Sequence, residues 1–403
     1  MTLPDPEVKS PLDGVKVLEL GSLIAGPYAS ALLAQFGAEV IKVEAPQEGD
    51  PLRGWRRLHR GTSLWWYSQS RNKKSLTLDL RTPEARDIVR RLAAEVDIVI
   101  ENFRPGTLEK WDIGWPQLSA LNPRLIMVRI SGYGQSGPYR ERPGFAAIAE
   151  CIGGLRHLTG YPDRAPVRTG VSLGDTLASL YGTIGALMAM HHLRANGGKG
   201  QYVDVALYES VFAVTESLLP EYSHDGYVRE RAGASLPGIC PSNTYACADG
   251  VYVAIGGNSD SIFQRLMRAI GRDDLADDPA LARNAGRVAQ AARIDAAITD
   301  WTGARDSAAV LAALDAAQVP AGSIYSAADI AADPHYRARD MIERHTLPDG
   351  TPIELPGVVP KLSQTPGRTR WLGPALGEHS REILASIGIE GQQFDALRAK
   401  GVV

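Results

Sequence analysis

Short apolar runs alternate with longer amphipathic segments over the first third of the chain. The runs predict buried strands at Val15–Leu20, Glu39–Val43, Asp97–Glu101 and Leu125–Ile130. Helical periodicity lies between them at Gly26–Phe36 and at Pro83–Val96, where Thr82 is suited to cap the helix. Strands separated by helices indicate βαβ units, so we predict an α/β fold with a Rossmann-like parallel sheet.

A long segment rich in Ala, Leu and Gly at Leu173–Leu193 predicts a buried helix. A strand at Tyr202–Leu207 and a helix at Glu209–Leu219 follow it, with Pro220 at the end of that helix. Around residues 229–243 the pattern lapses into Gly, Ser, Pro and Arg, which indicates a domain boundary.

Beyond this boundary, Gly250–Ile255 predicts a strand and Val319–Ile324 closes a smaller α+β domain. Helices are expected between them near residues 262–270, 287–302 and 308–317. Helical turns in the tail, at Ser380–Ile387 and Gly391–Lys400, are expected to pack back on the first domain. We therefore predict a large Rossmann-like domain of residues 1–225 and 340–403, a small α+β domain of residues 240–335 and a linker at residues 226–239.

The composition favours a soluble enzyme. The 403 residues are sufficient for two domains, and 44% of them are hydrophobic. A net charge of −3 argues against nucleic acid or a polybasic membrane patch as a partner. The N-terminus has no signal-peptide pattern, and no apolar stretch approaches the roughly 18 residues of a membrane span, so we expect a cytoplasmic location. The cysteines and histidines show no metal-ligand spacing, and no metal site is expected.

Two loops that follow predicted strands are candidates for ligand binding. The first, Gly21–Pro27, matches neither the GxGxxG fingerprint nor the P-loop pattern, which excludes the usual loops of nicotinamide and ATP enzymes. The second, Asn102–Arg104, lies at the carboxyl end of a strand, where open α/β sheets bind ligands. An adenine ring can stack on Phe103 while cations meet phosphates, although a polar turn explains the same residues. Arg71–Lys74 is predicted to be a solvated charge run.

Asp175 lies where a glycine-punctuated loop meets the long helix, and it has three interpretations. Ser172 and Asp175 have the spacing of a capping box. Gly170–Gly174 also fits the nucleophile elbow of serine esterases, with Ser172 as nucleophile and His345 or His379 as the distant histidine. Alternatively, Asp175 is a covalent nucleophile that the helix dipole keeps ionised, beside glycines that admit a bulky thioester. The residues alone leave all three open.

Taken together, these segments resemble the class III CoA-transferases, the family of the formyl-CoA and carnitine CoA-transferases. The resemblance covers nearly the whole chain. It is carried, in one order, by Pro11–Gly14, Ala25–Pro27, Gly37–Glu44, Asn72–Ser75, Glu101–Gly106, Ser131–Pro138, Gly174–Asp175 and Leu376–His379.

The resemblance implies that Asp175 is the catalytic aspartate. It also implies contacts with coenzyme A from Leu23, Ile24, Leu78, Arg81, Asn102, Phe103, Arg104 and Lys110. Two positions depart from the family pattern, since Ala45 replaces a phosphate-facing arginine and Ala146 replaces an acidic residue. The family further implies an interlocked homodimer, in which the loop Gly233–Gly238 covers Asp175 of the partner subunit.

The reaction expected from this resemblance moves CoA from an acyl-CoA donor to a carboxylic acid, through an aspartyl mixed anhydride and an aspartyl-CoA thioester. Acyl-CoA is then a substrate, and no tightly bound cofactor is expected. Arg168, His157, Arg229 and Arg231 could pair with a second carboxylate, so small dicarboxylic acids are the expected substrates. The alternative in the same family, a 2-methylacyl-CoA racemase, needs a second base, and no histidine lies between His59 and His157. A noncatalytic acyl-CoA binder is a further alternative.

Overall fold

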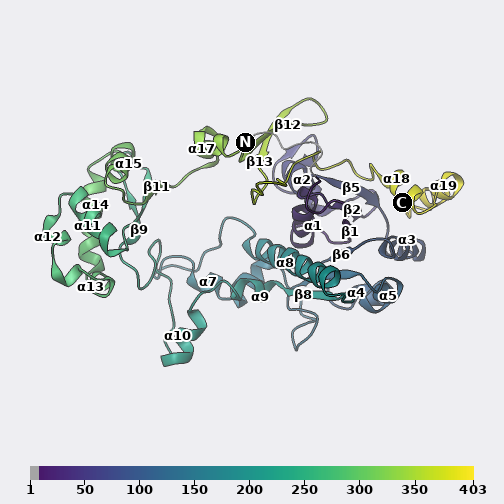
Figure 1. Cartoon of the computed structure of the whole chain (residues 1–403), viewed down its shortest axis with the longest axis horizontal. Helices are drawn as coiled ribbons and strands as arrows, with labels where there is room; N and C mark the ends of the chain where they lie inside the picture. The colour runs from purple at the N-terminus through teal and green to yellow at the C-terminus, as the bar shows by residue number, and fades with distance from the viewer. Residues whose placement is uncertain (1–8) are drawn as a thin grey trace. The chain divides into compact units, whose positions relative to one another are not determined.

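The computed structural model describes residues 9–403, which form two compact units (Figure 1). The first unit contains the chain up to Leu155, then Thr169–Glu216 and Arg339–Val403. The second unit contains Arg156–Arg168 and Ser217–Ala338. Within the described chain, no helix is both long enough and apolar enough to cross a membrane.

The first unit is built on a parallel sheet of six strands within residues 9–403, in the order β5-β2-β1-β6-β7-β8. The strands are β1 (Lys16–Glu19), β2 (Glu39–Glu44), β5 (Lys73–Thr77), β6 (Ile98–Glu101), β7 (Ile126–Ser131) and β8 (Tyr202–Ala206). Counted along the chain, this is the 3-2-1-4-5-6 order of the Rossmann fold. The order reverses between β1 and β6, so ligands are expected to bind at the carboxyl ends of these two strands. The predicted Rossmann-like sheet is confirmed.

Helices cover both faces of this sheet. They are α1 (Ala25–Gln35) and α8 (Leu173–Ala195) on one face, with α3 (Pro83–Ala93), α18 (Ser380–Ser386) and α19 (Gly391–Ala399) on the other. Because successive strand residues point to opposite faces, Val17 joins the core under α1 and α8, and Leu18 joins the core under α3. Phe394 of α19 lies in the same core as Leu18. The tail therefore packs on the sheet, as predicted.

Shorter elements complete the first unit. They are η1 (Pro51–Gly54), β3 (Leu58–His59), β4 (Thr62–Ser63), α2 (Leu64–Gln69), α4 (Thr107–Lys110), α5 (Trp115–Leu121), α6 (Ala146–Ile152), α9 (Leu207–Phe212), β12 (Ile342–Thr346) and β13 (Pro352–Pro356). Helix α7 (Leu155–Leu158) begins at the last residue of the first segment of the first unit, and its other residues belong to the second unit.

The second unit has an antiparallel sheet in the order β11-β10-β9. Its elements are α10 (Leu218–Asp225), β9 (Ser242–Ala246), β10 (Tyr252–Gly256), α11 (Asp260–Ala269), α12 (Asp273–Ala276), η2 (Pro279–Leu281), α13 (Asn284–Ala289), α14 (Ala291–Gly303), α15 (Ser307–Ala316), β11 (Ala321–Ser323), α16 (Ala327–Ala332) and α17 (Pro334–Ala338). Val253 and Ile255 of β10 pack against Phe263 of α11 and Ile298 of α14 in one core.

Three predictions about the elements are wrong. The helix expected at Glu209–Leu219 is interrupted between α9 and α10, and Pro220 lies in the first turn of α10, where its missing N–H removes no helical bond. The helix expected at residues 287–302 is divided at Gln290 into α13 and α14. Arg71–Lys74 is not a solvated run, because Lys73 is fully buried in β5 beside a carboxylate.

Candidate active site

The turn after β1 is tied to the turn after β6 at the point where the strand order reverses. The side-chain oxygen of Asn102 accepts a hydrogen bond from the Ser22 N–H at 2.8 Å, and its amide nitrogen donates to the Ser22 carbonyl at 2.9 Å. Both backbone polar groups of Ser22 in the first turn are thus held by one side chain. Asn102, predicted to contact coenzyme A, therefore shapes the turn that faces the ligand edge.

Leu23 in the same turn adopts the left-handed conformation, with φ of 65°. For a leucine this conformation costs of the order of 1 kcal/mol or more, so it persists only where its surroundings hold it. The Leu23 N–H donates to both carboxylate oxygens of Asp50 at 3.1 Å, and the Leu23 carbonyl accepts from Gln69 at 2.7 Å. Asp50 and Gln69 therefore fix the backbone of a predicted ligand-contacting residue.

A buried ion cluster of Glu19, Lys42, Asp50 and Lys73 lies beneath this turn. The Lys42 ammonium contacts Glu19 at 2.6 Å and Asp50 at 2.7 Å, and it donates to the Gly21 carbonyl at 3.0 Å. Lys73 contacts Glu19 at 2.8 Å and donates to the Pro27 carbonyl at 2.6 Å. The cluster thus joins β1, β2 and β5 to both ends of the turn.

Burial and ion pairing act against each other on these groups. Burial lowers the pKa of Lys73 to about 8, although Glu19 opposes the shift. For Lys42, burial is outweighed by the carboxylates of Glu19 and Asp50, which raise its pKa above the usual value. Asp50 in turn has a lowered pKa because Lys42 outweighs its burial. Lys42 and Asp50 are therefore a charged pair at neutral pH.

A second buried group, Glu101, supports the turn after β6. Glu101 accepts from the Arg129 guanidinium at 2.8 Å and from the Phe103 N–H at 2.8 Å. Arg129 also pairs with Glu109 of α4 at 2.7 Å. Burial raises the pKa of Glu101 to about 7, although Arg129 opposes this.

We expect the stability of the protein to fall between pH 5 and pH 8 because of Glu101. Its pKa is about 7 in the folded protein against 4.5 as the ordinary value, so the folded state binds the proton more tightly. This contribution is complete below the ordinary pKa and is lost as the pH rises through the folded pKa, up to about 3 kcal/mol. Glu101→Gln should flatten the profile of unfolding free energy measured in urea at several pH values.

Glu109→Gln is the matched control for that experiment. Burial of Glu109 is outweighed by its bonds with Arg129, and its pKa is lowered, so it stays ionised from pH 5 to pH 8. Its variant should keep most of the wild-type slope, because Glu109 is the smallest of the causes that act on the pKa of Glu101. Equal slopes for Glu101→Gln and the wild type would show that Glu101 does not titrate in this range.

Asp175 is the third residue of α8 and is half-buried in the first turn of the helix. The Ser179 hydroxyl, one turn further along, donates to the Asp175 carbonyl and to the Ala25 carbonyl of α1, both at 2.7 Å. Helix α8 also packs closely on the sheet. A Cβ atom added to Gly182 would lie only 3.1 Å from the side chain of Val128 in β7. The start of α8 is therefore held beside the start of α1, which follows the Leu23 turn.

Two interpretations of Ser172 do not agree with this geometry. Its backbone has φ of −81° and ψ of 69°, away from the extended conformation usual for an N-cap, and within the described chain its side chain caps no helical N–H. The capping-box interpretation is therefore wrong. A nucleophile elbow needs a strand directly before the serine, but the preceding strand in the part of the chain described is β7, which ends at Ser131.

The remaining predicted contact residues differ in exposure. Ile24 and Leu78 are buried in the first unit, and Phe103 is half-buried, with its ring edge-on to Trp111 at 5.6 Å. Arg81 is exposed and pairs with Asp79 at 2.8 Å.

Two predicted cations remain available for an anionic ligand. Arg104 and Lys110 are exposed, and their side chains form no hydrogen bond or ion pair within residues 9–403. Ala45 is exposed after β2, so this position supplies no cation. Among the described residues, no cluster of His, Cys, Asp and Glu is arranged to hold a metal ion.

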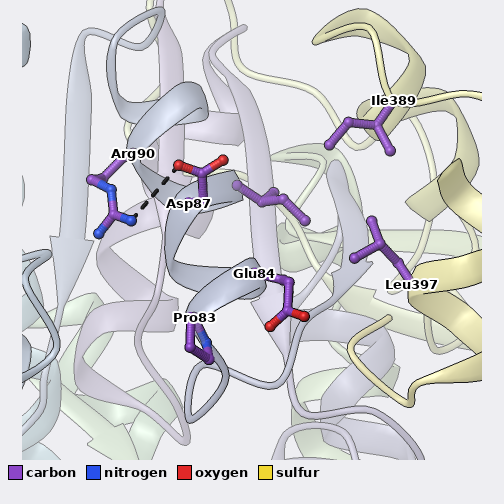
Figure 2. A pocket seen from close by; sticks show the side chains of 7 residues that line it. Pro83, Glu84, Asp87, Arg90, Ile389 and Leu397 are labelled. Carbon is purple, nitrogen blue, oxygen red and sulfur yellow. Dashed lines mark ion pairs between the residues drawn. The ribbon is translucent and has the colours of Figure 1, made fainter.

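A surface hollow of about 430 Å³ lies elsewhere on the first unit (Figure 2). It is lined by Pro83, Glu84, Asp87, Ile88, Arg90, Ile389 and Leu397. None of these residues belongs to the predicted site. The hollow is formed by α3 and the tail, on the face of the sheet opposite α1 and α8.

Comparison with known proteins decides the family. The sequence model of CoA-transferase family III matches residues 12–380. This chain belongs to CoA-transferase family III. The result confirms the family and the class of enzyme predicted from the sequence.

Relatives in the family are similar over nearly their whole length. The chain is 50% identical to "Succinyl-CoA--D-citramalate CoA-transferase" of Chloroflexus aurantiacus, covering 98% of each protein. It is 44% identical to the beta subunit of "Succinyl-CoA--L-malate CoA-transferase" of the same organism, again over 98% of each. A solved CAIB/BAIF family protein from Brucella suis superposes with a TM-score of 0.82 at 37% identity, over 94% of this chain and all of that one. The CoA-transferase family III fold is thus shown.

Sequence reasoning missed the groups that hold the turns of this CoA-transferase. Glu19, Lys42 and Lys73 each lie within or beside an apolar strand. A charged residue in a strand buried on both faces needs a partner of opposite charge, and this signal was available in the sequence.

Proposed function

We propose that the protein transfers CoA from succinyl-CoA to a dicarboxylic acid of four or five carbons, with Asp175 as the covalent nucleophile. The relatives named above use succinyl-CoA with citramalate or malate, and both cover this chain almost completely. The observation that carries the proposal is the place of Asp175, in the first turn of α8 beside the tied turns at the carboxyl edge of the sheet. The helix dipole there favours the ionised carboxylate by roughly 0.3–1 kcal/mol.

The reaction proceeds through two covalent states of Asp175. Its carboxylate attacks the carbonyl of succinyl-CoA and expels the CoA thiolate, which leaves a succinyl-aspartyl anhydride. The thiolate then attacks the aspartyl carbonyl of the anhydride, which releases succinate and forms an aspartyl-CoA thioester. The acceptor carboxylate attacks this thioester and expels the thiolate again. The thiolate finally attacks the acyl carbonyl of the acceptor, which yields the new acyl-CoA and free Asp175.

The predicted contact residues have separate roles in this proposal. Arg104 and Lys110 are exposed cations that bind CoA phosphates. Phe103 is half-buried, and the exposed part of its ring stacks on the adenine. The Gly174 N–H already donates to Glu150 at 3.4 Å, so another backbone amide has to stabilise the oxyanions.

Among the arginines expected to bind a second carboxylate, Arg231 is the best candidate. Arg229 pairs with Glu221, which compensates its charge. Arg231 donates to the carbonyls of His157 and Tyr161 and forms no ion pair within the described chain. A guanidinium oriented by carbonyls keeps its charge for an anionic substrate.

The proposal is tested by incubating the purified protein with succinyl-CoA and a panel of acids that includes citramalate, malate and monocarboxylic acids. We expect new acyl-CoA only with dicarboxylic acids, and hydroxylamine or borohydride trapping should map an adduct to Asp175. Transfer to monocarboxylic acids alone would refute the substrate class. Deuterium incorporation into a 2-methylacyl-CoA in D₂O without any acceptor would favour the racemase instead.

We further propose that the protein is a homodimer. Helix α8 exposes an apolar stripe formed by Leu180, Ile184, Leu187 and Met188, whose exposed fractions are 40%, 45%, 37% and 67%. These residues recur at helical spacing on the face turned away from the sheet. A contiguous apolar face of this kind marks an interaction surface.

We expect Ile184→Glu combined with Met188→Glu to convert the dimer into monomers, because two charges would have to be desolvated in the interface. Sedimentation velocity at several protein concentrations measures the change. Leu121→Glu, at an exposed position of α5, which packs with α3, is the control and should leave the dimer intact. A monomeric wild type, or a double variant that sediments like the wild type, would refute this interface.

A further inference from the structure

Helix α6 has an unusual distribution of side chains. It exposes Ile148 and Ile152, with 45% and 50% of their surface accessible, but it buries Glu150 completely. A carboxylate is costly to bury unless hydrogen bonds or charges compensate it. This pattern, with isoleucines exposed and a carboxylate buried, indicates that Glu150 interacts with a polar group on the surface against which α6 packs.

That surface is the start of α8. The Gly174 N–H, one of the first amides of α8 and without a partner inside the helix, donates to Glu150 at 3.4 Å. Ser172 does not cap the helix, so Glu150 supplies an acceptor from a neighbouring helix instead. The two helices pack closely at this point. A Cβ atom added to Gly174 of α8 would lie only 3.2 Å from the Cβ of Ala146 of α6.

We propose that Glu150 is a positioning residue that holds Asp175 in the orientation required for attack on the thioester. Gly174 directly precedes Asp175, so the bond to Glu150 fixes the backbone from which the nucleophile projects. Ala146 and Glu150 lie one helical turn apart on α6, and both lie against Gly174. The inference rests on the proposed function, in which Asp175 is the nucleophile.

The test compares three variants of Glu150 with the wild type in steady-state and single-turnover CoA transfer. Because misplacement by about 1 Å can cost 10²-fold in rate, Glu150→Ala should lower kcat about 100-fold and change KM for succinyl-CoA less than about threefold. Glu150→Gln keeps an oxygen acceptor for the Gly174 N–H, so it should recover most of the lost rate. Glu150→Asp keeps the charge but is too short, and it should resemble Glu150→Ala.

Asp97→Asn is the matched control, since Asp97 also accepts from a backbone N–H, that of Lys16 at 2.9 Å, but at the amino edge of the sheet. It should leave kcat unchanged. A folded Glu150→Ala with wild-type kcat, or a Glu150→Gln no better than Glu150→Ala, would overturn the positioning role. If Glu150→Ala does not fold, Glu150→Asp replaces it in both comparisons. Asp175→Asn is measured alongside, because full activity of that variant would overturn the proposed function itself.

Discussion

Replacing Asp175 with Asn is expected to lower kcat for CoA transfer by about 10³-fold or more, because the amide cannot form the anhydride. Asn has nearly the same shape, so the fold should persist. The loss of charge in the first turn of α8 should cost about 1 kcal/mol of stability or less. We expect transfer to stop while the affinity for CoA stays unchanged. The transfer rate is measured over a range of succinyl-CoA concentrations, and the affinity is measured by calorimetric titration with CoA.

Ser172→Ala is the informative companion to that variant. Ser172 lies three residues before Asp175, yet its side chain caps no helical N–H within the described chain. Its removal should leave transfer within about twofold of the wild type. If Ser172→Ala were inactive and Asp175→Asn active, the serine-esterase interpretation would replace the proposed one. If both were fully active, neither residue would be the nucleophile.

The sheet and its principal helices could be predicted because their apolar periodicity is strong. Thr82 caps α3 as expected, with its hydroxyl accepting from the Ala85 N–H at 3.3 Å. The interruption between α9 and α10 was missed because the residues around Phe212 are apolar enough to continue a helix. Local periodicity does not report where tertiary packing ends an element.

The positions of the turns that carry the candidate site residues could be predicted from the sequence, but the contacts that hold these turns could not. The turns at Leu23 and Asn102 follow strands, and the parallel sheet brings them together at the point where its order reverses. The pairings of Asn102 with Ser22 and of Glu150 with Gly174 join residues far apart along the chain. No local pattern contains such a pairing. It becomes visible only when the fold places the two groups together.

The Lys42→Met variant tests whether the ion cluster beneath the turn is required for the fold. Lys42 is buried between Glu19 and Asp50, so its removal leaves Asp50 without its lysine partner and Glu19 with only Lys73. Breaking a buried pair in this way costs about 3–5 kcal/mol. The change in unfolding free energy is measured by urea titration, and KM for succinyl-CoA should rise because Asp50 holds the Leu23 turn.

Lys74→Met provides the control from the neighbouring strand. Lys74 pairs with Glu39 and Glu382 on the surface, and exposed pairs contribute less than about 1 kcal/mol to stability.

The pH dependence of the unfolding free energy separates the two variants further. Lys42 holds the pKa of Asp50 below its usual value, so in the wild type this contribution to stability is present at neutral pH and is lost as the pH falls through that lowered pKa. The deficit of Lys42→Met should therefore shrink as the pH falls toward 4, where a buried carboxyl without its cation takes up a proton. A deficit that is the same at all pH values, or that is matched by Lys74→Met, would mean that charge pairing in the cluster does not hold the turn.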